Sequence, residues 1–167
     1  MPEPATKVTI YTDGSCLNNP GGPGGWAAIL VHEETGSRKE ISGGRASTTN
    51  NRMEIMAVLE SLRVLNRPCA VDIYTDSQYV SNSITKGWLM SWQKNGWVDK
   101  KKKPRLNADL WKEMLKELAR HKVTLHWIRG HQGHPENERC DELAKSRAME
   151  DGLPEDPGFN PSDYLNS

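Results

Sequence analysis

Five short runs of β-branched, aromatic and other apolar residues are bounded by turn residues, a pattern typical of β-strands. They cover residues 7–13, 25–33, 38–43, 70–75 and 122–128. The second and third runs are joined by the turn-like residues 34–37 and predict a hairpin. The chain therefore begins with three strands in succession.

Apolar residues recur at helical spacing in the segments that follow. This spacing predicts helices over residues 51–65, over 78–92 with an interruption near Gly87, and over 108–121. A last helix follows a loop at 130–137 and runs to about Met149. Three strands followed by alternating helices and strands indicate an α/β domain with a mixed sheet. We expect this domain to span residues 1–151, with residues 152–167 as a flexible tail because they hold three prolines and several acids.

A repeat narrows the topology. Residues 8–13 (VTIYTD) return as residues 71–76 (VDIYTD), with Tyr and Asp in the same phase of each strand. If the two strands are parallel neighbours, Asp13 and Asp76 stand side by side at their carboxyl ends, where open α/β sheets place ligands. A chance echo between two short segments is the alternative.

Composition excludes some classes of protein. The 167 residues suit one domain, and 22 Lys and Arg balance 22 Asp and Glu, so net charge does not identify an anionic partner. No apolar run approaches the roughly 18 residues of a membrane span, and the first residues lack the features of a signal peptide. Widely spaced Cys16, Cys69 and Cys140 predict reduced thiols. We therefore expect a cytoplasmic, monomeric protein with no membrane partner.

Four carboxylates are candidates for chemistry, although each also has an ordinary structural explanation. Asp13 and Asp76 end predicted strands, where aspartate often makes turns or caps helices. Glu54 could be the capping partner of Asn51, and Asp141 could favour the positive end of the last helix. Gathered at one sheet edge, however, these four charges would repel one another and would persist mainly where a cation binds.

Oxygen-only ligands select hard ions such as Mg²⁺ or Mn²⁺. Two such ions can activate a water molecule and stabilise the leaving oxygen in a phosphoryl displacement. The carboxylates therefore indicate a metal-dependent phosphoryl-transfer or hydrolysis site.

Five ordered motifs carry a resemblance to a known family. They are Tyr11-Thr12-Asp13-Gly14-Ser15, Thr49-Asn50-Asn51-Arg52-Met53-Glu54, Tyr74-Thr75-Asp76-Ser77-Gln78, Trp127-Ile128-Arg129-Gly130-His131 and Asn137-Glu138-Arg139-Cys140-Asp141. From about residue 7 to 149 the chain resembles bacterial-type (type 1) ribonuclease H. The resemblance implies a five-stranded mixed sheet flanked by helices, with the first and fourth strands parallel.

The resemblance also implies an activity. Asp13, Glu54, Asp76 and Asp141 would bind two Mg²⁺ ions, which Mn²⁺ can replace, and the enzyme would cut the RNA strand of RNA–DNA hybrids. The products would carry 5′-phosphate and 3′-hydroxyl ends. A resolvase or integrase of the same fold and a non-catalytic hybrid-binding module are the rivals; the motifs argue against the first and the complete acidic set against the second.

His131 has two interpretations. With His134 and Cys140 it could form a zinc site, but this loop has no second cysteine. A histidine on a glycine-flanked loop can instead exchange protons near neutral pH. The resemblance implies this auxiliary role for His131, in proton transfer or product departure.

Basic and aromatic residues interleave between the second and third predicted helices. They are Trp88, Trp92, Lys94, Trp97, Lys100, Lys101, Lys102 and Lys103. A solvated loop or a nuclear-localisation run would also explain four lysines, but charge combined with aromatic stacking suits a nucleic-acid groove. The resemblance implies a basic protrusion that grips the DNA strand, with Trp88 lining the DNA channel.

Other polar residues flank the acidic motifs. The amides of Asn19, Asn50 and Gln78 can both donate to and accept from a 2′-hydroxyl, and the resemblance places them at the minor groove of the hybrid. It places Thr49 and Asn107 in a pocket for a DNA phosphate. Alone, such residues are more often turn and cap residues.

The loop that begins at Cys16 is the remaining candidate substrate contact. It departs from the family pattern, because Asn18 stands where glycine is usual and residues 21–25 hold one extra glycine. The asparagine that precedes a proline, Asn19, is the better match for the family position. The resemblance therefore does not predict the backbone path of this loop.

Overall fold

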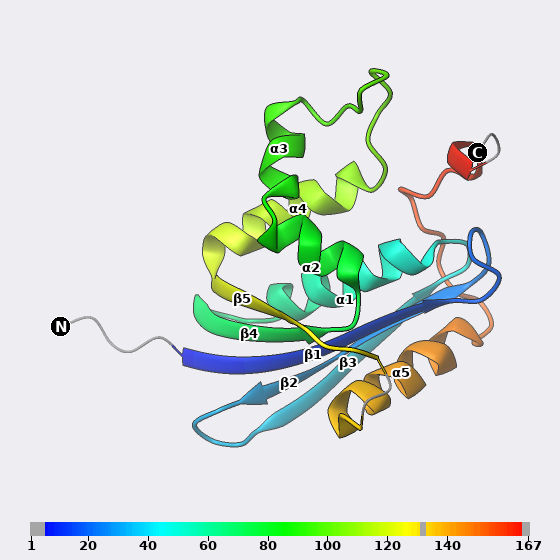
Figure 1. The fold of residues 1–167 in the computed structure, drawn as a ribbon. Helices are drawn as coiled ribbons and strands as arrows, with labels where there is room; N and C mark the ends of the chain where they lie inside the picture. The colour runs from blue at the N-terminus through cyan, green and yellow to red at the C-terminus, as the bar shows by residue number, and fades with distance from the viewer. Residues whose placement is uncertain (1–5, 131–132, 165–167) are drawn as a thin grey trace.

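The computed structural model describes residues 6–130 and 133–164. Its five strands are β1 (Thr6–Cys16), β2 (Gly24–His32), β3 (Arg38–Arg45), β4 (Cys69–Thr75) and β5 (Lys122–Trp127). They form one sheet in the order β3-β2-β1-β4-β5 (Figure 1). The pairs β1–β2 and β2–β3 are antiparallel, whereas β1–β4 and β4–β5 are parallel. The predicted five-stranded mixed sheet is confirmed.

Helices cover both faces of this sheet (Figure 1). They are α1 (Asn50–Arg63), α2 (Gln78–Thr85), α3 (Trp88–Lys94), α4 (Ala108–Arg120) and α5 (Pro135–Ala148), followed by a 3₁₀ turn, η1 (Pro161–Tyr164). The helices α1, α2 and α4 lie on one face and α5 on the other. Left-handed Gly87, at φ 75°, separates α2 from α3, as the interrupted pattern predicts. None of the helices in the described ranges is long and apolar enough to cross a membrane.

Two apolar layers hold the helices to the sheet. The larger layer joins α1, α2 and α4 to the sheet through fully buried residues such as Ile10, Ile55, Ile73 and Trp111. On the opposite face, α5 packs Cys140 and Ala144 against Ala27 and Ile29 of β2. This second contact is close, because a Cβ atom on Gly25 would lie 2.0 Å from the Ala144 carbonyl oxygen. The inner strands β1 and β2 are thereby held between α1 and α5.

The repeat in the sequence corresponds to a pair of aligned parallel strands. Equivalent residues are partners, including Val8 with Val71 and Tyr11 with Tyr74. The two tyrosine rings stack with their centroids 5.4 Å apart. Asp13 and Asp76 each come two residues later, so the register directs both to the same edge of the sheet. The prediction of parallel neighbouring strands is confirmed.

The segment after α5 differs from the expected flexible tail. Residues 153–164 return to the body of the protein, where the Ala46 amide donates to the Pro154 carbonyl. Asp156 is only 6% exposed and accepts hydrogen bonds from buried Arg52 and from Thr48. A buried guanidinium requires a counter-charge, and the tail supplies one. Composition alone concealed this contact, so the expectation of a flexible extension needs correction over residues 153–164.

Candidate active site

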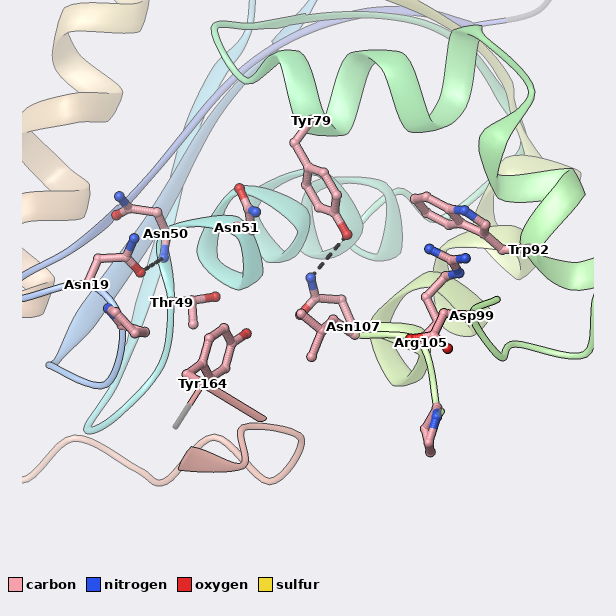
Figure 2. A pocket seen from close by; sticks show the side chains of 13 residues that line it. Asn19, Thr49, Asn50, Asn51, Tyr79, Trp92, Asp99, Arg105, Asn107 and Tyr164 are labelled. Atoms are coloured by element: carbon pink, nitrogen blue, oxygen red, sulfur yellow. Dashed lines mark hydrogen bonds between the residues drawn. The ribbon is translucent and has the colours of Figure 1, made fainter. Parts of the chain in front are cut away.

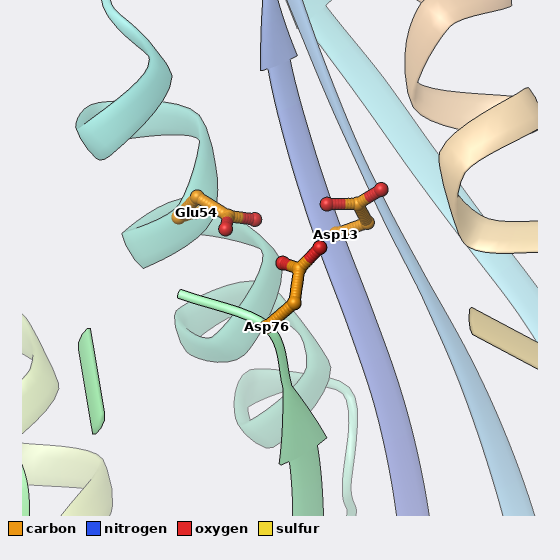
Figure 3. Close-up of side chains that lie close together, drawn as sticks. All are labelled: Asp13, Glu54 and Asp76. Atoms are coloured by element: carbon orange, nitrogen blue, oxygen red, sulfur yellow. The ribbon is translucent and has the colours of Figure 1, made fainter. Parts of the chain in front are cut away.

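Three carboxylates meet at the edge of the sheet (Figure 3). Asp13 lies on β1 beyond its last pairing with β4, Asp76 directly follows β4, and Glu54 lies on α1. One oxygen from each lies within 4.8 Å of the others. Gly14 makes this approach possible, because a Cβ atom there would lie 2.4 Å from the Glu54 amide nitrogen. The predicted convergence of these three residues is therefore present in the structure.

Local capping does not explain the three carboxylates. Thr49 is the N-cap of α1, since its hydroxyl accepts from the Arg52 amide at 3.1 Å, so Glu54 is not the capping partner of Asn51. Ser77 caps α2 and leaves Asp76 without that role. Asp13 does not end a strand, because β1 continues to Cys16. These positions differ from the ordinary alternatives that the sequence left open.

Burial and mutual repulsion disfavour the charged forms. Asp13 and Glu54 are 8% and 9% exposed. Burial, the Asp76 charge and a hydrogen bond with Asp141 raise the pKa of Asp13 to about 8. Burial, with the charges of Asp13 and Asp76, raises the pKa of Glu54 well above its usual range. The buried Oε1 atom of Glu54 has no hydrogen-bond partner among the described residues. A divalent cation would satisfy that oxygen and remove the repulsion, so this donor set fits Mg²⁺ or Mn²⁺.

Asp141 stands beside this group. It lies in the middle of α5, which begins at Pro135, so it does not open the last helix as expected. Its carboxylate pairs with Lys145 at 3.0 Å, and its side chain is 25% exposed. Asp141 lines a cavity of about 450 Å³ together with Asp13, Glu54 and Asp76. It is thus placed to complete a set of four acids around this cavity.

His131 lies outside the described residues. The chain that leads to it passes close to Asp76, since Trp127 Nε1 donates to the Asp76 carbonyl oxygen at 3.1 Å and a Cβ atom on Gly130 would lie 3.0 Å from Asp76 Oδ2. Cys140 is fully buried on the side of α5 that packs against the sheet, where its thiol donates to the Tyr11 carbonyl. Burial raises the pKa of the Cys140 thiol, which disfavours the thiolate that zinc would require.

A second, larger cavity of about 530 Å³ lies next to the start of α1 (Figure 2). It brings together five of the predicted substrate-binding residues, namely Asn19, Thr49, Asn50, Trp92 and Asn107. The side-chain Oδ1 atom of Asn19 accepts from the backbone amide of Asn50 at 3.1 Å and ties the loop between β1 and β2 to α1. Tyr79, Arg105 and Tyr164 also line this cavity, which we call the α1 groove, and sequence reasoning did not find them.

The backbone conformation at Asn18, in the loop between β1 and β2, accounts for the asparagine that departs from the family pattern. Asn18 adopts a left-handed backbone with φ 55°, a conformation that asparagine tolerates better than most residues. Cys16 faces the inside of this loop, where its thiol donates to the carbonyls of Gly22 and Thr48 at 3.4 and 3.5 Å. Gln78 lines the cavity of the carboxylates instead of the α1 groove.

The predicted substrate-binding lysines, Lys94 and Lys100–Lys103, line neither cavity. Lys94 ends α3, and Lys100–Lys103 are exposed on the loop that follows it. Asp99 shapes this loop by accepting from the amides of Lys101 and Lys103 at 2.8 and 3.0 Å. Trp88 is 40% exposed and packs near Trp92, with 6.3 Å between ring centroids.

Trp97 lies at the base of the same loop, where it is partly buried against the larger apolar layer. The ammonium of Lys112, on α4, lies over its ring at 5.8 Å from the centroid. The lysines therefore extend from a loop that is held at its base, beside an aromatic surface.

Comparisons with known proteins agree with this geometry. A family model described as RNase H matches residues 5–149. A ribonuclease H of Nitratidesulfovibrio vulgaris (strain DP4) is 60% identical over 152 residues, covering 91% of this chain and 96% of its own length. A ribonuclease H of Aeromonas salmonicida (strain A449) is 54% identical over 154 residues, with 92% and 97% covered.

Solved structures show the same fold. LC9-RNase H1, described as a type 1 RNase H with the type 2 active-site motif, has a TM-score of 0.79 at 31% identity, with 89% of this chain and 74% of that one covered. A foamy viral protease–reverse transcriptase, solved in complex with RNA/DNA hybrid, has a TM-score of 0.73 at 24% identity. The aligned region covers 87% of this chain and 20% of the foamy viral chain, and this likeness concerns the fold alone.

Proposed function

The chain belongs to the ribonuclease H family and is a hydrolase, and on that premise we propose that it cuts the RNA strand of RNA–DNA hybrids by a two-metal-ion mechanism that leaves 5′-phosphate and 3′-hydroxyl ends. The observation that carries the proposal is the acidic cluster of Asp13, Glu54 and Asp76, in which one buried Glu54 oxygen has no hydrogen-bond partner among residues 6–130 and 133–164. Such a cluster is electrostatically costly and is explained by bound cations.

Asp13, Glu54, Asp76 and Asp141 would hold the ions. When bound, Mg²⁺ lowers the pKa of a coordinated water and stabilises charge on the phosphate and the leaving oxygen. Because the pKa of Asp13 is about 8 without a cation, loading the site requires this carboxyl to release its proton near neutral pH. Metal affinity should therefore rise with pH. Mn²⁺ should substitute, because it accepts the same oxygen ligands.

His131 would assist by moving a proton near Asp76, since Gly130, the residue before it, lies beside Asp76. Asn50, which lines both cavities, and Gln78 would contact 2′-hydroxyl groups of the RNA strand, and Asn19 would hold the first loop against α1. A side chain that lines both cavities is placed to contact one continuous substrate.

The other strand of the hybrid would lie across the α1 groove. Thr49 and Asn107 would bind a DNA phosphate there, Trp88 would line the path of the DNA, and Lys94 and Lys100–Lys103 would attract its backbone. Cys16 shapes the adjoining loop. We propose that the enzyme works as a monomer in the cytoplasm, in keeping with free thiols at its three cysteines.

A substrate panel tests the proposal. Wild-type protein is incubated with end-labelled RNA–DNA hybrid, RNA duplex and DNA duplex, with Mg²⁺ or with a chelator, and the product ends are mapped by phosphatase and ligase treatment. Cleavage confined to the RNA of the hybrid and dependent on Mg²⁺ is expected. Equal cutting of DNA duplex would favour the resolvase-like rival, and binding without cutting would favour a non-catalytic module.

An aspartate on β4 and one just after it provide a test variant and a matched control. Asp76→Asn removes a carboxylate from the acidic cluster, whereas Asp72→Asn makes the same change on β4 at an exposed residue that pairs with His126 at 2.7 Å. Asp76→Asn should lose nearly all cleavage, and Asp72→Asn should stay close to wild type. Similar losses in both variants would contradict the assignment of Asp76.

A further inference from the structure

The α1 groove presents hydrogen-bond donors. The Tyr79 hydroxyl accepts from Asn107 Nδ2 and from Trp111 Nε1, both at 3.1 Å, so its own proton is free to be donated. The Thr49 hydroxyl accepts from a backbone amide of α1, which leaves its proton for its other partner, the Tyr164 hydroxyl. Arg105 adds a guanidinium to the lining. A groove with donors of this kind suits an anionic group such as a phosphate.

Asp99 is the acid in this lining, and its charge is already directed elsewhere. Its Oδ1 atom accepts from the amides of Lys101 and Lys103. Those bonds, the one from Lys103 first, hold the pKa of Asp99 below its usual range. The carboxylate is thus held by its own loop, which reduces its opposition to an anion.

Tyr164 enters the same groove from the C-terminal segment. Figure 2 shows its ring beside Thr49, on the side of the groove away from Tyr79. Burial raises the pKa of Tyr164 and outweighs a hydrogen bond with the Thr49 side chain, which lowers it. The phenol therefore stays protonated at neutral pH, and its own proton can be donated to a ligand. The groove keeps about 530 Å³ with this ring in its wall. Tyr164 therefore borders the space and leaves room for a phosphate and its sugar.

Contacts of Phe159 and Asp156 hold the segment that carries Tyr164 in place. Its ring stacks on Phe159 with a centroid distance of 5.7 Å. Three residues earlier than Phe159, Asp156 accepts from Arg52 at 2.7 and 3.0 Å, and both side chains are 2% exposed. Arg52 also donates to Asn107, so the ion pair that anchors the segment is joined to the opposite wall of the groove.

We propose that Tyr164 is a further substrate-binding residue, whose hydroxyl donates a hydrogen bond to a backbone phosphate of the hybrid in the α1 groove. The inference rests on the proposed function. Because the phenol is neutral, its contribution should be independent of salt, in contrast to contacts made by lysines.

Binding of labelled hybrid, followed by fluorescence anisotropy on an Asp13→Asn background, tests this role without cleavage. Tyr164→Phe keeps the stacking on Phe159 and removes only the hydroxyl, and it should weaken binding about 3–10-fold, as expected for one solvent-accessible bond to a charged group. The slope of affinity against salt should not change. Ser162→Ala, on the same turn but exposed and outside the groove lining, should bind like the parent protein.

Methylphosphonate substitution identifies the phosphate. Single neutral linkages are placed along the DNA strand in one series and along the RNA strand in another. At one position, in either strand, the penalty of Tyr164→Phe should disappear, and the strand identifies the source of the phosphate. In active protein the same variant should raise KM and leave kcat within about twofold.

The possible failures are distinguishable. Wild-type protein that neither binds nor cuts hybrid would overturn the proposed function together with this inference. Wild-type cleavage with unchanged binding by Tyr164→Phe, or tighter binding, would overturn the role of Tyr164 alone. Each variant should unfold at the same temperature as wild type. A loss of binding that accompanies a loss of thermal stability, and that is the same at every methylphosphonate position, would also overturn the role of Tyr164.

Discussion

Replacing Asp13 by asparagine should stabilise the metal-free protein while it abolishes cleavage. In the folded state the pKa of Asp13 is raised to about 8, whereas that of an ordinary aspartate is 3.8. The folded state therefore holds a proton that the unfolded chain releases, and stability falls as pH rises from 3.8 to about 8. Asparagine has nearly the same shape and no charge to repel Glu54 and Asp76.

The magnitude follows from the pKa values. Starting at pH 3.8, the cost of keeping Asp13 in the acidic cluster grows by about 1.36 kcal/mol per pH unit, to roughly 4 kcal/mol at pH 7. The asparagine amide is itself buried, and an unsatisfied amide costs about 1–3 kcal/mol. The net gain of Asp13→Asn at pH 7 should therefore be about 1–3 kcal/mol. Near pH 4 the gain should vanish or reverse, because Asp13 is then protonated in the folded wild-type protein.

Urea unfolding of both proteins in chelator, from pH 4 to pH 9, measures this difference. Adding Mg²⁺ should stabilise wild type more than the variant, because ligand binding raises stability with site occupancy. Asp72→Asn is the control, and the change to its exposed hydrogen bond with His126 should alter stability by no more than about 1 kcal/mol. A variant that is no more stable than wild type at pH 8, or a gain that does not depend on pH, would refute the reasoning.

Three further predictions concern other parts of the molecule. Neutralising Lys100–Lys103 to glutamine should raise KM and flatten its dependence on salt, with kcat near wild type; an unchanged slope would mean that these lysines are only a solvated loop. Asp156→Ala should lower stability by about 3–5 kcal/mol in urea unfolding, because it leaves Arg52 buried with less counter-charge, and a loss below about 1 kcal/mol would contradict this view. His131→Ala should reduce kcat by about 10²-fold or less and leave KM similar, whereas complete inactivity would make His131 a ligand or an obligatory base.

Most of the fold could be predicted because its signals are local. Alternation, helical spacing and the repeat of residues 8–13 at 71–76 identified the strands, the helices and one parallel pair. The errors lie where distant partners override local preference. Gly14-Ser15 suggests a turn, yet β1 continues to Cys16 because β2 pairs with it through Gly24. The helix that carries Asp141 begins earlier than expected, with Pro135 in its first turn, a position that proline favours.

The sequence predicted the carboxylates of the candidate site more completely than the residues that line the α1 groove. Asp13, Glu54 and Asp76 stand in recognisable motifs, and register carries the two aspartates to one edge. Tyr164 has no such motif, and its place depends on Asp156 finding a partner 104 residues earlier in the chain. A pairing over that separation has no periodicity that could reveal it. The acidic, proline-containing composition of residues 152–167 predicted a segment exposed to solvent. The structure differs because the buried charge of Arg52 pairs with Asp156 of this segment.

The first turn of α1 links the two cavities. Thr49 caps this helix and lines the α1 groove, Arg52 anchors the C-terminal segment, and Glu54 reaches the acidic cluster one turn later. A single rigid helix start thereby sets the distance between the site that would hold a DNA phosphate and the site that would hold the ions. Since a small misplacement of reacting groups can cost much of the rate, the buried Arg52–Asp156 pair serves geometry as well as stability. This explains why a costly buried ion pair stands beside the groove, where apolar packing could have provided stability alone.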